Sequence, residues 1–140
     1  MDYQFSKDFL WGAASSGPQS EGSFPGDQKA EMEWDYWFKQ APELFYEGVG
    51  PSVASDFYHK YKEYAGLMKE IGMNSYRTSI QWSRLIKDCE GTVNPEGAAF
   101  YNAVIDELLS RGIEPILCIH HFDMPMYWVE TGGFENWETG

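Results

Sequence analysis

Residues 94–121 read NPEGAAFYNAVIDELLSRGIEPILCIHH, and this stretch decides the fold class. Asn94 is a good helix cap, and Pro95 suits the first helical position because its fixed backbone angle is already helical. Four apolar residues with helical spacing are expected to face inward: Tyr101, Val104, Ile105 and Leu108. Gly112 is well placed to end the helix. The apolar run from there to His121 is typical of a strand, so the stretch predicts a helix, a glycine and a strand.

The same order of elements occurs once more, earlier in the chain. A helix is expected from about Ser55 to Ile71, because five residues recur on one face: Phe57, Tyr61, Tyr64, Met68 and Ile71. Gly72 follows, and residues 74–80 have strand character. A short buried strand is also expected at residues 9–14. Strands that alternate with helices predict an α/β fold with a parallel sheet, and apolar runs without alternation predict burial on both faces.

The segment between the first strand and the first long helix is less regular. A turn of small residues is expected at 15–18, and an aromatic patch follows at 34–38. Residues 40–52 contain two prolines and two glycines, which predicts a long loop.

Composition excludes several classes of protein. The 140 residues contain 10 Lys and Arg against 22 Asp and Glu, and a net charge of −12 argues against a nucleic-acid partner. The hydrophobic content of 43% argues against disorder, and no apolar stretch approaches the length needed to cross a membrane. Residues 1–8 lack the pattern of a secretory signal. Cys89 and Cys118 form no metal-type or redox pair, so a cytoplasmic location is expected.

Two motifs suggest ligands that their surroundings rule out. Gly12 and Gly17 have the spacing of a phosphate-binding loop, but Pro18 stands where that motif needs lysine and lacks the backbone N–H that would bind phosphate. A metal site at Cys118, His120 and His121 is not expected, because alternation along a strand points the last of these away from the other two. We therefore expect neither a metal nor a cofactor.

Three polar residues are candidates for a binding site. Gln19 lies beyond the end of the first strand, Arg77 within the second, and His121 at the end of the third. Ligand sites of parallel α/β folds form at the carboxyl ends of the strands. The sequence leaves simpler roles open: Gln19 as a loop residue, Arg77 in a structural ion pair, and His121 as a hydrogen-bonded core residue.

Four ordered motifs resemble glycoside hydrolase family 1, the retaining β-glycosidases. They are FLWGAASSGPQSEG at 9–22, YRTSIQWSR at 76–84, HFDMP at 121–125 and GGFEN at 132–136. Pro18 departs from the residue usual before the glutamine, and Phe122 stands where many members have tryptophan. The resemblance extends from about residue 5 to residue 138. It implies a (β/α)8 TIM barrel, of which residues 1–140 would form about the first three βα units of a single catalytic domain.

The resemblance also implies roles for the three candidates. Gln19 and His121 would bind hydroxyls of the non-reducing sugar, since each offers both a donor and an acceptor. Arg77 would hold the nucleophilic carboxylate and keep it ionised. Candidate surfaces for stacking on sugars are the tryptophans Trp34, Trp37, Trp82 and Trp128, although core packing is the simpler expectation for most of them.

Family members hydrolyse β-glycosides with two glutamates, an acid/base and a nucleophile. The Asn-Glu-Pro and Glu-Asn-Gly segments that carry them do not occur here, so no catalytic residue is expected in this chain and both glutamates are expected beyond Gly140. Local similarity favours the 6-phospho-β-glucosidase branch and a small-molecule, 6-phosphorylated β-glycoside substrate. The alternative is a non-catalytic carbohydrate-binding module or an inactive truncated fragment. Nothing in the sequence specifies an oligomeric state.

Overall fold

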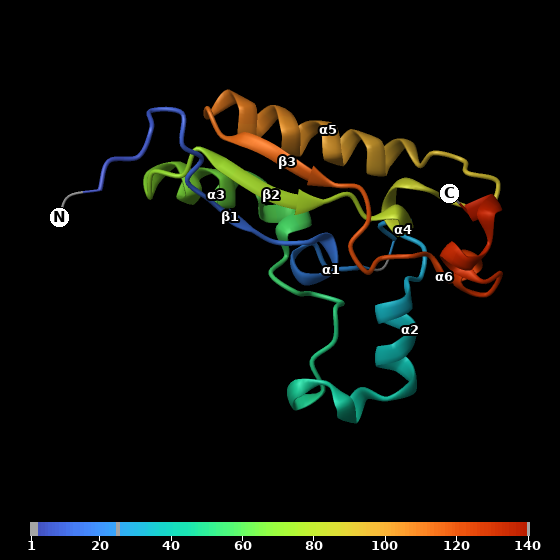
Figure 1. Ribbon diagram of the computed structural model, residues 1–140. Coiled ribbons are helices and arrows are strands. Elements are labelled where there is room, and N and C mark those ends of the chain that lie inside the picture. The colour runs from blue at the N-terminus through green and yellow to red at the C-terminus, as the bar shows by residue number, and fades with distance from the viewer. Residues whose placement is uncertain (1–2, 25, 140) are drawn as a thin grey trace.

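The computed structural model describes residues 3–24 and 26–139, so the expected domain limits at 1 and 140 lie outside the described residues. Within these described residues, three strands and six α-helices follow one another (Figure 1). Their order is β1 (Gly12–Ala14), α1 (Gly17–Ser20), α2 (Glu33–Gln40), α3 (Phe57–Glu70), β2 (Ser75–Ser79), α4 (Trp82–Leu85), α5 (Pro95–Ser110), β3 (Glu114–Cys118) and α6 (Met126–Val129). Single 3₁₀ turns occur at Pro42–Leu44, Tyr46–Gly48, Gly133–Glu135 and Trp137–Thr139.

The strands form one parallel sheet in the order β1-β2-β3, which confirms the predicted α/β architecture. Ala14 lies opposite Arg77, and Arg77 lies opposite Ile116, so the three strands are in register across the central strand. Asn74 fixes the start of β1, because its side chain accepts the Trp11 N–H and donates to the Phe9 carbonyl. Because both strand pairs are parallel, the carboxyl ends of all three strands lie at the same edge of the sheet.

The predicted helix over residues 95–110 is confirmed, together with its start and its end. The Asn94 side chain accepts the Glu96 N–H at 3.2 Å, and Pro95 is the first helical residue. Gly72 and Gly112 follow the two long helices with φ angles of +82° and +70°, which glycine adopts without strain. Each glycine thus turns a helix back toward the sheet.

Helices α3 and α5 pack against one face of the sheet and form the core. Its buried members are Phe57, Ala65, Tyr76, Phe100, Tyr101, Val104, Leu108 and Ile113, and Tyr61, Tyr64 and Met68 pack against them as half-buried neighbours. Two residues that were predicted to face inward are not part of this core. Ile105 is only half-buried, and Ile71 is 70% exposed because α3 ends at Glu70, one residue before it.

The expectation that the strands are buried on both faces is wrong for β1 and β3, whereas four of the five residues of the central strand β2 are buried. Strand β1 is exposed and spans only three residues, Leu10 and Trp11 before it are about half exposed, and Ile116 on β3 is also exposed. The physical reason is that α3 and α5 cover one face, while β1 and β3 are the edges of the three-stranded sheet. Several apolar residues on and next to these edge strands are consequently exposed, among them Ile116, Leu117 and Ile119.

The short helices gather beyond the carboxyl ends of the strands, with α2 and the turn segment 42–48 farthest from the sheet (Figure 1). The expected turn at 15–18 contains the start of α1, and the aromatic patch at 34–38 lies within α2. A backbone bridge between Met32 and Pro125 joins the segment before α2 to the segment before α6. Within residues 3–24 and 26–139, no helix is long and apolar enough to cross a membrane.

Candidate functional site

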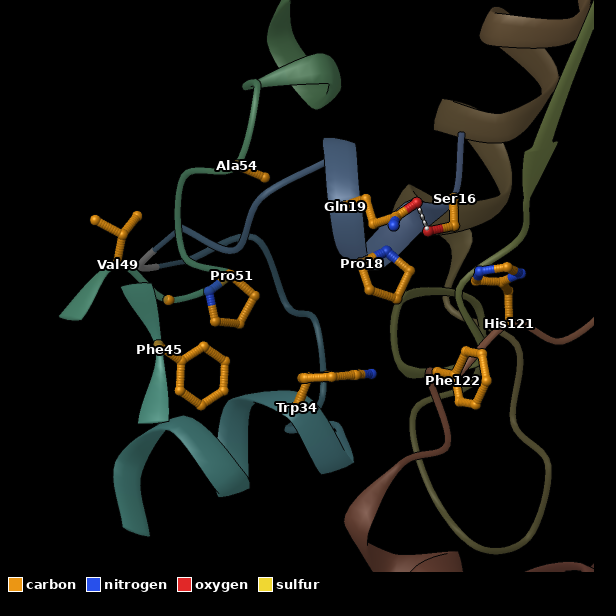
Figure 2. Close-up of a pocket in the computed structure, with 11 residues that line it drawn as sticks. Ser16, Pro18, Gln19, Trp34, Phe45, Val49, Pro51, Ala54, His121 and Phe122 are labelled. Carbon is orange, nitrogen blue, oxygen red and sulfur yellow. Dashed lines mark hydrogen bonds between the residues drawn. The ribbon is translucent and has the colours of Figure 1, made fainter. Parts of the chain in front are cut away.

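A pocket opens at the carboxyl edge of the sheet, and two of the three predicted site residues line it. Its volume is about 300 Å³. The lining residues are Ser16, Pro18, Gln19, Trp34, Phe45, Val49, Gly50, Pro51, Ala54, His121 and Phe122 (Figure 2). They come from the segments that follow β1 and β3, which the parallel sheet brings together although about 100 residues separate them. The pocket is thus mostly apolar with a few polar groups, as is usual for small-molecule sites.

Gln19 presents its side-chain amide to this pocket from α1. The Ser16 hydroxyl donates a hydrogen bond of 2.9 Å to the side-chain amide oxygen of Gln19, Oε1 (Figure 2). This bond orients the amide, so that its NH₂ group is the end left to donate. Among the described residues, that NH₂ group has no hydrogen-bond partner. Gln19 can therefore donate to a ligand hydroxyl.

Arg77 holds His121 from the central strand. The Arg77 Nη2 lies 3.1 Å from His121 Nδ1, and Nη1 donates to the Ser15 carbonyl at 3.1 Å. Because a guanidinium has only donors, Nδ1 of His121 must accept, and the neutral ring then carries its proton on Nε2. The structure thus places a second residue with an N–H donor, His121, in the lining of the pocket together with Gln19.

Arg77 was expected beside a nucleophilic carboxylate. In the part of the chain that the structure describes, Arg77 forms no ion pair, and its partners are His121 and the carbonyl of Ser15. The expected role of Arg77 toward a carboxylate stays a prediction.

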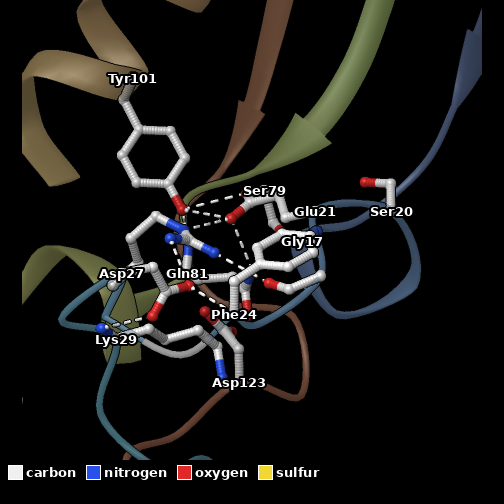
Figure 3. Close-up of polar contacts among 12 residues, drawn as sticks. Gly17, Ser20, Glu21, Phe24, Asp27, Lys29, Ser79, Gln81, Tyr101 and Asp123 are labelled. Carbon is white, nitrogen blue, oxygen red and sulfur yellow. Dashed lines mark hydrogen bonds and ion pairs between the residues drawn. The ribbon is translucent and has the colours of Figure 1, made fainter. Parts of the chain in front are cut away.

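Sequence reasoning missed a buried polar cluster around Glu21, Gln81 and Tyr101 (Figure 3), to which Arg84 also belongs. Glu21 Oε2 accepts from Arg84 Nε at 2.8 Å and from Gln81 Nε2 at 2.6 Å, and Oε1 accepts from the Tyr101 hydroxyl at 3.1 Å. Burial raises the pKa of the Glu21 carboxyl, and the charge of Arg84 opposes that shift. The cluster joins the end of α1 to α4 and α5, and so anchors the segment that carries Gln19.

Arg84 has further partners that fill its donor capacity. Nη1 pairs with Asp27 at 3.1 Å, and Nη2 donates to the Gly22 carbonyl at 2.9 Å. The guanidinium carbon also lies 4.3 Å from the centre of the Tyr58 ring. With 22 acidic residues in the chain, no local signal could have singled out Glu21 and Asp27 as its partners.

The comparison with protein families identifies the chain. The model of glycosyl hydrolase family 1 matches residues 1–139. The chain belongs to glycosyl hydrolase family 1. The resemblance found in its four motifs is thereby confirmed.

Two curated relatives of this family 1 chain come from Bacillus subtilis (strain 168). The 6-phospho-beta-glucosidase GmuD is 51% identical over 137 residues, which are 98% of this chain and 30% of GmuD. The aryl-phospho-beta-D-glucosidase BglC is 43% identical over 133 residues, which are 94% of this chain and 28% of BglC. The chain thus spans about 30% of the length of the curated relatives it matches.

A solved family 1 structure confirms the fold class. The psychrophilic beta-glucosidase BglU from Micrococcus antarcticus superimposes with a TM-score of 0.90 at 40% identity, over 98% of this chain and 29% of BglU. Its barrel fold and the parallel β1-β2-β3 sheet agree with the predicted first βα units of a (β/α)8 barrel.

The four tryptophans named as stacking candidates occupy different surroundings in this family 1 chain. Trp34 lines the pocket, and Trp37 is exposed on the same helix, next to a smaller hollow. The Trp82 Nε1–H donates to the Ile119 carbonyl at 2.7 Å, and its ring packs edge-on against Trp128 at 5.3 Å. Trp34 is thus the best placed of the four to meet a ligand in the pocket.

Proposed function

We propose that this chain is the N-terminal part of a retaining β-glucosidase that acts on 6-phospho-β-glucosides in the cytoplasm. The observation that carries the proposal is the pair of N–H donors, from Gln19 and His121, at one pocket of a family 1 fold. Neighbouring sugar hydroxyls need such donors, and the apolar lining suits the faces of a sugar ring. The names of GmuD and BglC favour a phosphorylated glucoside.

In the proposed mechanism, a glutamate nucleophile and a glutamate acid/base lie about 5–5.5 Å apart, and a covalent glycosyl intermediate forms and is hydrolysed. Both glutamates are expected in the sequence beyond Gly140. The residues described here would bind and orient the sugar. Contacts to hydroxyls that strengthen in the transition state increase the rate of the chemical step as well as the affinity.

The substrate class can be tested on the full-length protein with paired aryl-β-glucosides, one carrying a 6-phosphate and one without it. We expect a higher kcat/KM for the phosphorylated glucoside. Equal kcat/KM values for the two would contradict the phosphate preference and leave a plain β-glucosidase. No turnover of either, with sugar binding retained, would favour the non-catalytic carbohydrate-binding module.

Replacement of the two donors tests their roles directly. In the full-length enzyme, His121→Ala and Gln19→Ala are each expected to lower kcat/KM by roughly 10- to 100-fold, the loss expected for one well-formed polar contact in a buried site. Thermal unfolding should change little. Matched controls are His59→Ala and Gln4→Ala, since both side chains are exposed and away from the pocket. Unchanged kinetics in both pocket variants would show that Gln19 and His121 have structural roles only.

A further inference from the structure

Asp123 follows the pocket residues His121 and Phe122 in the chain, and its carboxylate contacts the main chain of two segments. Its side chain is fully buried. One carboxylate oxygen, Oδ1, accepts the His121 N–H at 2.8 Å, and the other, Oδ2, accepts the Trp82 N–H at 2.7 Å. These two donors belong to the segments that follow β3 and β2, respectively. Asp123 therefore ties together the two segments at the carboxyl edge of the sheet.

The residue between His121 and Asp123 adopts an unusual backbone conformation. Phe122 has a φ angle of +55°, in the left-handed region that bulky side chains rarely occupy. Such a conformation persists only where surrounding contacts hold it, and it is concentrated at functional sites. The bond from the His121 N–H to the Asp123 carboxylate spans this residue and holds the turn in place.

The turn determines which groups reach the pocket. His121 and Phe122 both line it, with their ring centres 5.3 Å apart and their planes perpendicular (Figure 2). Arg77 holds the His121 ring from the strand, but no contact of Arg77 holds the main chain of His121. Loss of the left-handed turn would rotate Phe122 and move the imidazole relative to Gln19.

We propose that Asp123 is a positioning residue that sets the orientation of His121 and Phe122 toward the sugar, an inference that rests on the proposed glycosidase function. It acts through the main chain and does not touch the pocket itself. An aspartate suits this place better than asparagine, because both of its oxygens accept from backbone donors. His120 Nδ1 lies 3.4 Å from Oδ1 and has no hydrogen-bond partner among the described residues.

The first test needs no substitution of Asp123 and no activity. In the full-length wild-type protein, amide hydrogen exchange at His121 and Trp82 is expected to be slow, because both N–H groups donate to a buried carboxylate. Fast exchange at both positions would overturn the proposal. The ¹⁵N spectrum of the His121 imidazole, assigned with His121→Gln, should show the tautomer with its proton on Nε2.

The second test is Asp123→Asn in the full-length enzyme, which keeps the size of the side chain and one acceptor. We expect kcat/KM to fall about tenfold and the His121 ¹⁵N signals to change. The control is Asp88→Asn. The Asp88 carboxylate lies away from the pocket, and it accepts a hydrogen bond of 2.9 Å from the Thr92 N–H. This control should leave both readouts unchanged.

The outcomes separate the positioning role from a structural role and from the proposed function. If Asp123→Asn lowers only the melting temperature, and leaves kcat/KM and the His121 signals as in the wild type, Asp123 is a structural anchor and the proposal is wrong. If the wild type hydrolyses neither glucoside, the proposed function fails. In that case the His121 signals of Asp123→Asn still decide the role of Asp123. If the variant does not fold, fast exchange at His121 and Trp82 in the wild type still overturns the proposal.

Discussion

A polypeptide of residues 1–140 produced alone is expected to show no turnover of aryl-β-glucosides, with or without a 6-phosphate, and to self-associate. Inactivity follows from the chemistry proposed above, because groups that bind a sugar cannot complete a double displacement without an acid/base and a nucleophile. Enzyme assays of this fragment beside the full-length protein measure the first part of the prediction.

Self-association follows from the sheet. Strands β1 and β3 are both edges, and an exposed edge offers unpaired N–H and C=O groups to another chain. Exposed apolar side chains on β3 and just after it add to this tendency, among them Ile116 and the 75%-exposed Ile119. The net charge of −12 favours solubility, but it does not substitute for the missing packing partners of these apolar side chains.

Light scattering and thermal unfolding measure this second part. A monomeric fragment that unfolds cooperatively and hydrolyses a glucoside would contradict both parts of the prediction. It would favour instead an independent domain that carries its own catalytic groups.

The sequence predicts those parts of the fold that depend on neighbours along the chain. The start of α5 at Asn94 and its end before Gly112 could be predicted because capping and glycine turns act over a few residues. Gln19 and His121 could be placed at one pocket, because the parallel order of strands fixes which ends meet. The burial of the strands could not be predicted, since it depends on what covers each face.

Contacts between distant segments had no signal in the sequence. Asp123 meets the backbone of Trp82 across 41 residues, and Arg84 meets Glu21 across 63. The left-handed turn at Phe122 is likewise invisible, because nothing in its side chain favours a positive φ. Apart from Phe122, these residues do not line the pocket. The sequence thus indicates the groups that face the ligand better than the groups that hold them.

Arg84→Met in the full-length protein is expected to lower the free energy of unfolding by about 3–5 kcal/mol, because it leaves the Glu21 carboxylate buried without its counter-ion. Both side chains of this pair are at most 2% exposed. The variant also leaves the Gly22 carbonyl without its donor. Unfolding by urea, followed by fluorescence, measures the loss.

The exposed pair Arg111–Glu107 supplies the matched control. Its N–O distance is 2.6 Å, but both side chains are partly exposed on α5 and just after it. Arg111→Met should therefore cost less than about 1 kcal/mol, as is usual for surface ion pairs. A similar loss of unfolding free energy in the two variants would show that the burial of Glu21 does not increase the cost of removing its counter-ion.

The loss in Arg84→Met should also depend on pH, with a sign set by Glu21. Burial raises the pKa of this carboxyl, and removing Arg84 takes away the charge that opposes the shift, so the folded variant binds a proton more tightly than the unfolded chain. A group with such a raised pKa in the folded state contributes less stability as the pH rises above about 4.3, which is the pKa of a glutamate in the unfolded chain. Arg84→Met should consequently be less destabilised at pH 5 than at pH 7.5. Combining Arg84→Met with Glu21→Gln should restore part of the stability at pH 7.5 and remove the pH dependence. If the double variant remains as pH-dependent as Arg84→Met, the titrating group is not Glu21.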